Sequence, residues 1–213
     1  MSRKRVWDRE HWAGFCRRIY EARRRLADLV GGFPATKGFC ASHADAMLLV
    51  RNRLDDFLLR LEGVYREQVG RRDGTGEFWD MTCGPDVSPS ARPPAVVAPV
   101  MPVIPPAEWV EIGREWKGID REFLELSRLL LETVPKNHRA KAAMDRLIRA
   151  SCFARAALEG LAHKQYPAWD RVTRVFFGPD EPDAEDAGGP AFGLRTPRGE
   201  SGVFRRISTE RSA

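Results

Sequence analysis

Apolar residues recur at steps of three and four along four segments of the chain, which is the spacing of one face of an α-helix. The helices that this pattern predicts span about 8–30, 43–68, 107–133 and 138–164. Their apolar rows are Trp12–Leu29, Met47–Val64, Trp109–Leu130 and Met144–Leu161. Turn residues separate the rows, among them Gly31-Gly32, Pro34 and Pro135. We therefore predict an all-α fold, an antiparallel four-helix bundle built from two helical hairpins.

The two hairpins match each other when the chain is shifted by 97 residues. Trp12 then aligns with Trp109, and Leu61-Glu62-Gly63 aligns with Leu158-Glu159-Gly160. An internal duplication would explain the match. Two unrelated hairpins with long apolar rows would also align in this way by chance, so both explanations stay open.

The pattern divides the chain into five parts. These are a basic N-terminal arm over 1–7, hairpin one over 8–68, a Pro-rich crossover over 69–106, hairpin two over 107–164 and a flexible acidic and basic tail over 178–213. The bundle domain spans 8–177, with 166–177 as a short helix or strand against its end. Phe78 and Trp79 are placed to dock on the bundle. Residues 85–106 form either a structural strap or a docking segment for a partner.

Composition and charge exclude several classes of protein. The longest uncharged apolar stretch, 93–107, holds six prolines, so no transmembrane helix or membrane partner is expected. The start of the chain is no secretory signal. Four cysteines without a Cys-x-x-Cys pair are typical of a reducing compartment, and we predict a cytoplasmic protein. Arginine outnumbers lysine 29 to 6, a bias that a GC-rich bacterial genome also produces.

Candidate chemistry is sparse. Cys40 and His43 supply two zinc ligands, and His11 with Cys16 would have to supply the others. No Glu-x-x-His, Gly-x-Ser-x-Gly or P-loop sequence occurs. Cys152, beside Phe153, is expected to be a buried small hydrophobe. We therefore predict no catalytic, cofactor-binding or metal residues, and favour a protein that is not an enzyme.

One further spacing needs attention. Arg5 and His11 have the Arg-x4–6-His spacing of helical ribonucleases. The pair straddles the expected start of the first helix, which does not favour a nuclease.

Arginine placement is the most informative feature of the surface. The first 72 residues hold 16 basic and 9 acidic residues, and the whole chain has a net charge of +5. Three of the predicted helices have basic outer faces, whereas the segment 108–132 holds four basic and seven acidic residues. The residues expected to contact nucleic acid or a partner are Arg17, Arg18, Arg24, Arg25, Arg51, Arg53, Arg139, Lys141, Arg146 and Arg149. No aromatic residues are interleaved with them, so the expected contact is to the phosphate backbone and tolerant of sequence.

These observations leave three hypotheses for function. The first is a non-enzymatic intracellular interaction protein whose basic faces contact nucleic acid or an acidic partner within a larger complex. The second is a scaffold that binds only proteins, through the Pro-rich strap and the acidic third helix. Self-association fits either hypothesis, because the acidic helix of one copy suits the basic first helix of another. The third is a helical enzyme whose site has no recognisable motif.

A short turn carries one resemblance. The segment Val134-Pro135-Lys136-Asn137-His138-Arg139 joins two predicted helices and resembles the Phe-Pro-Lys-x-x-Arg turn of small bacterial four-helix proteins. Among these are retroelement accessory variability proteins, which are basic oligomers that assist a reverse transcriptase. The resemblance covers six residues, with valine in place of phenylalanine, and does not assign the chain to that family.

Overall fold

The computed structural model describes residues 5–32, 41–70, 74–84 and 103–178, and in these ranges it contains helices and no strand. The helices are α1 (Arg9–Gly32), α2 (Ala41–Val69), α3 (Gly74–Cys83), α4 (Pro106–Thr133), α5 (Arg139–Gln165) and α6 (Val172–Phe177). The all-α prediction is confirmed. Three predicted features lie wholly or largely outside the described residues: Cys40, the strap predicted over 85–106, of which 85–102 is not described, and the tail predicted over 178–213, of which 179–213 is not described.

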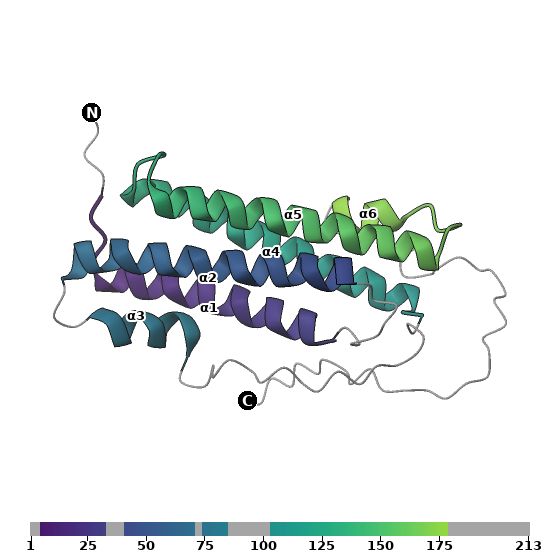
Figure 1. Ribbon diagram of the computed structural model, residues 1–213, viewed down its shortest axis with the longest axis horizontal. Helices are drawn as coiled ribbons and strands as arrows, with labels where there is room; N and C mark the ends of the chain where they lie inside the picture. Colours follow the sequence, from purple (N-terminus) through teal and green to yellow (C-terminus); the bar gives the residue numbers. More distant parts are fainter. Residues whose placement is uncertain (1–4, 33–40, 71–73, 85–102, 179–213) are drawn as a thin grey trace.

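The four long helices lie side by side along one direction (Figure 1). Helix α2 packs along α5 in the opposite direction, and α1 packs against α4. The apolar rows turn inward, because the rings of Trp12, Phe57, Trp109 and Phe123 are all buried. Their burial supplies the main stabilisation of the fold.

The two short helices pack against the long ones, α3 against α1 and α2, and α6 against α4 and α5. Helix α3 lies inside the segment predicted as the Pro-rich crossover, and the buried Phe78 packs against Tyr65 with ring centroids 5.5 Å apart. The expected docking of Phe78 explains why this polar, glycine-bearing segment is ordered. The segment 166–177 was predicted to be a short helix or a strand, and it contains the helix α6. Val172 and Phe176 of this helix are buried against α4 and α5.

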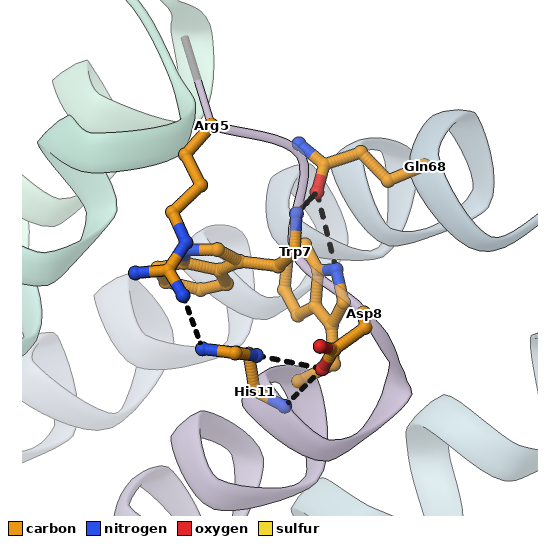
Figure 2. Close-up of polar contacts among 6 residues, drawn as sticks. Arg5, Trp7, Asp8, His11 and Gln68 are labelled. Carbon is orange, nitrogen blue, oxygen red and sulfur yellow. Dashed lines mark hydrogen bonds and ion pairs between the residues drawn. The ribbon is translucent and has the colours of Figure 1, made fainter.

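Two glutamines, one near the end of α2 and one at the end of α5, each hold the segment that precedes the helix before them, α1 or α4. Gln68, near the end of α2, accepts hydrogen bonds at Oε1 from the backbone N–H of Trp7 and the indole of Trp12, at 3.1 and 3.2 Å (Figure 2). Gln165, at the end of α5, accepts the matching pair from the backbone N–H of Ile104 and the indole of Trp109, at 3.1 and 3.0 Å. Each contact therefore recurs 97 residues later in the chain.

Candidate nucleic-acid interface

Two of the predicted contact residues on α1 are engaged within the chain. Arg18 donates to Glu122 at 2.5 Å, and Arg25 donates to Glu115 through two nitrogens at 3.0 and 2.9 Å. Both acids belong to α4, so the acidic helix meets the basic helix inside one molecule. Because these charges are paired within one molecule, they are not available for self-association between two copies.

The remaining predicted residues on α1 are more exposed. Arg24 lies 3.9 Å from Asp28 on its own helix. Arg17 is exposed and forms no ion pair with any described residue. Helix α1 thus keeps the exposed Arg17 and Arg24 on its outer side, whereas the arginines that face α4 are paired with glutamates.

One ion pair marks the register between α2 and α5. Arg146 of α5 donates to Asp56 of α2 at 2.9 Å, and Arg60 approaches the same carboxylate at 3.4 Å. The hydrogen bond from Arg146 and the charges of both arginines hold the pKa of Asp56 below its usual value. Because α2 and α5 are antiparallel (Figure 1), the positions one turn before Asp56 and one turn after Arg146 lie at the same level, and these positions are Arg53 and Arg149.

We call the surface made by Arg53, Arg60, Arg139, Arg146 and Arg149 the α2–α5 face. Residues 139, 146 and 149 share one side of α5 and extend over roughly 15 Å at about 1.5 Å per residue. Within the described residues, Arg53, Arg139 and Arg149 form no ion pair. Asp56 therefore pairs with two of these five arginines, Arg60 and Arg146, and the other three carry charges without an ion pair to a described residue.

The two other predicted residues of these helices lie elsewhere. Arg51 is exposed on α2 and comes two positions before Arg53, which places it on a different side of the helix. Lys141 is paired with Asp145 on α5. The structure thus brings together four of the ten predicted contact residues, namely Arg53, Arg139, Arg146 and Arg149, and disperses the others.

The prediction that Cys152 is buried is wrong. Cys152 is exposed, and the neighbouring Phe153 is 61% exposed. Both residues follow Ser151, which belongs to the buried row, and so they project from the outer side of α5. Phe153 comes four residues after Arg149 and seven after Arg146, so it shares their side of the helix.

A buried polar network joins α4, α5 and α6. Asp120 accepts a hydrogen bond from Ser151, and Arg155 lies 2.7 Å from its other carboxylate oxygen. Burial raises the pKa of Asp120, although Ser151 and Arg155 act in the opposite sense. The Arg155 guanidinium also lies 4.4 Å from the ring centroid of Phe177. Because Ser151 is fully buried, this network orders helices and offers no accessible nucleophile.

The Arg5 and His11 side chains are brought together despite straddling the start of α1. Arg5 Nη2 lies 2.7 Å from His11 Nε2, and Asp8 lies 2.6 Å from His11 Nδ1 (Figure 2). Asp8 also accepts a hydrogen bond from the backbone N–H of His11 at 2.9 Å, which is the contact of a helix N-cap. The backbone N–H of Arg5 donates to the carbonyl of Glu132. These bonds tie the N-terminal arm to α1 and α4.

Other candidate sites receive no support. The described residues contain no cluster of three or more His, Cys, Asp and Glu side chains arranged around a metal. Burial raises the pKa of the Cys16 thiol to about 12, which makes it a poor ligand and nucleophile at neutral pH. None of the described helices combines the length and apolar character needed to span a membrane.

Comparison with known proteins adds no relative. The chain matches no protein-family model, and no curated protein or solved structure is similar to it.

Proposed function

We propose that this protein is a non-enzymatic interaction protein whose α2–α5 face binds the phosphate backbone of nucleic acid. The observation that carries the proposal is the juxtaposition of Arg53 and Arg149 without ion-pair partners among the described residues. Guanidinium groups bind phosphate through two parallel hydrogen bonds, and release of the counterions from the nucleic acid drives binding.

The contrast between the two sides of the molecule supports this choice of surface. On the α1–α4 side, Arg18 and Arg25 are matched by Glu122 and Glu115. On the α2–α5 face, Asp56 pairs with Arg60 and Arg146, whereas Arg53, Arg139 and Arg149 form no ion pair with a described residue. Clustered like charges destabilise a fold, and a polyanionic ligand would relieve their repulsion.

We also infer that the scaffold is an antiparallel four-helix bundle formed by two copies of one duplicated hairpin. The repeated glutamine anchors support this inference, as do the two ion pairs between α1 and α4. The residue 97 positions after Arg18 is Glu115, and the residue 97 positions before Glu122 is Arg25. These two residues form the second pair. A pseudo-twofold axis between the hairpins accounts for this exchange.

The direct test compares two variants that lose the same charge. The variant Arg53→Gln with Arg149→Gln removes the unpaired arginines of the α2–α5 face. The control variant Arg114→Gln with Arg128→Gln removes two exposed arginines of α4, each of which lies beside a glutamate of its own helix. Fluorescence anisotropy with a labelled oligonucleotide should show weaker binding only for the first variant. Equal loss in both variants, or no binding by the unaltered protein, would overturn the proposal.

A further inference from the structure

Phe153 is an exposed aromatic side chain with no evident role in the fold. It is 61% exposed, whereas the large aromatic residues of the apolar rows, such as Trp109 and Trp116, are fully buried. Phe177 is 45% exposed, but its ring is covered on one side by Arg155. Phe153 has no aromatic or cationic partner among the described residues.

The register of α2 and α5 places Phe153 at the end of the arginine row. The ion pair between Asp56 and Arg146 marks one level of the groove. The next level holds Arg53 and Arg149, and one further turn brings Leu49 and Phe153 to face each other. Leu49 is half-buried and packs on the core, whereas Phe153 is exposed to solvent. The α2–α5 face therefore ends at an exposed aromatic side chain.

We propose that Phe153 is a stacking platform for an unpaired base, so that the α2–α5 face binds single-stranded nucleic acid more tightly than duplex. This inference rests on the proposed function, because the arginines must hold the backbone for a base to reach the ring. Every base has a flat face that stacks on an aromatic ring, whereas bases within a duplex are already stacked on each other. The sequence alone did not predict stacking, because no aromatic residue was expected among the basic residues.

The test measures binding of the full chain to labelled oligothymidylate and to the duplex of the same strand with oligoadenylate. Base stacking on an aromatic ring contributes about 1–3 kcal/mol, so Phe153→Ala should weaken single-strand binding roughly 5- to 150-fold. Duplex binding should be unchanged, and Phe153→Trp should retain single-strand binding. The control Leu59→Ala removes another exposed apolar side chain of α2, which is 59% exposed, and should have no effect.

The outcomes separate the two proposals. If Phe153→Ala leaves single-strand binding unchanged while Arg53→Gln with Arg149→Gln weakens it, the stacking inference fails and the proposed function stands. If both variants bind like the unaltered protein, the proposed function fails as well. Equal weakening on single strand and duplex overturns stacking, as does a smaller apparent mass of Phe153→Ala than of the unaltered protein in size-exclusion chromatography, which would assign Phe153 to self-association.

Discussion

The Trp12 indole donates a hydrogen bond to Gln68 across 56 residues of chain, at 3.2 Å. The same oxygen accepts the backbone N–H of Trp7, so one amide fixes both the start of α1 and the segment before it. The Trp109 indole makes the same hydrogen bond to Gln165, so this indole-to-glutamine contact joins α1 to α2 and also α4 to α5.

Replacing Gln68 or Gln165 should lower the free energy of unfolding by a similar amount. Gln68→Leu and Gln165→Leu would each leave an indole N–H and a backbone N–H without their acceptor. We expect each variant to lose about 1–3 kcal/mol of unfolding free energy. Urea denaturation of the two variants and the double variant checks this. Additive losses of similar size agree with two equivalent anchors, and a large loss from only one variant contradicts their equivalence.

The mirrored ion pairs between α1 and α4 should contribute little individually. Both pairs are partly exposed, so solvent and salt screen them. Double-mutant cycles on Arg18–Glu122 and on Arg25–Glu115 should each give a coupling energy of about 0.2–1 kcal/mol that falls with added salt. Coupling in only one of the two cycles would count against a symmetric α1–α4 contact.

Helix α6 needs a glycine at position 113. A Cβ at Gly113 would lie 2.6 Å from Val175 Cγ1 and 2.7 Å from the Val175 carbonyl oxygen. We therefore expect Gly113→Ala to displace α6 and destabilise the protein by about 1–3 kcal/mol. At Gly63 a Cβ would meet nothing within 4 Å, so Gly63→Ala in α2 should stabilise by about 0.5–1 kcal/mol. Thermal unfolding of the two variants should shift in opposite directions.

Two aspartates should give stability profiles of opposite sign in acid. Burial raises the pKa of Asp120 in the folded state above 3.8, the ordinary value of an aspartate. Its contribution is therefore present below pH 3.8 and is lost as the pH rises through the folded pKa. Measured by urea denaturation across pH, the stability of the unaltered protein relative to Asp120→Asn should fall as the pH rises.

Asp56 provides the matched comparison. Arg146 and Arg60 lower the pKa of Asp56 in the folded state below 3.8, so its contribution is present above that pH and is lost as the pH falls. The stability difference between the unaltered protein and Asp56→Asn should shrink in acid. A profile for Asp56→Asn that follows the trend of Asp120→Asn would show that Arg146 does not hold this carboxylate.

Most of the helical fold follows from the spacing of apolar residues. The rows from Trp12 and from Trp109 are buried as predicted, because a helix with one apolar face must cover it. Helix α3 was not predicted, since its helical pattern is short and its stability depends on the docking of Phe78 against Tyr65. A contact between residues of different helices is not visible in a local pattern.

The arginine cluster could be predicted only in part. Sequence identified the basic residues, but it gave Arg18 and Arg149 equal standing. Their difference arises from the packing partner, because Arg18 meets the acidic α4 whereas Arg149 lies at the level of Arg53 of α2. The prediction for Cys152 was wrong because the preceding residue, Ser151, points into the core, where it bonds to Asp120. The helix phase therefore leaves Cys152 and Phe153 outside.

The dependence of binding on salt tests most directly whether the α2–α5 face holds phosphates. For a single strand, the logarithm of the association constant should fall linearly with the logarithm of salt concentration, with a slope of about −0.7 for each phosphate contacted. The variant Arg53→Gln with Arg149→Gln should reduce that slope by about 1.4, while Arg114→Gln with Arg128→Gln leaves it unchanged. A binding constant independent of salt, or one slope shared by all three proteins, would contradict phosphate binding at this face.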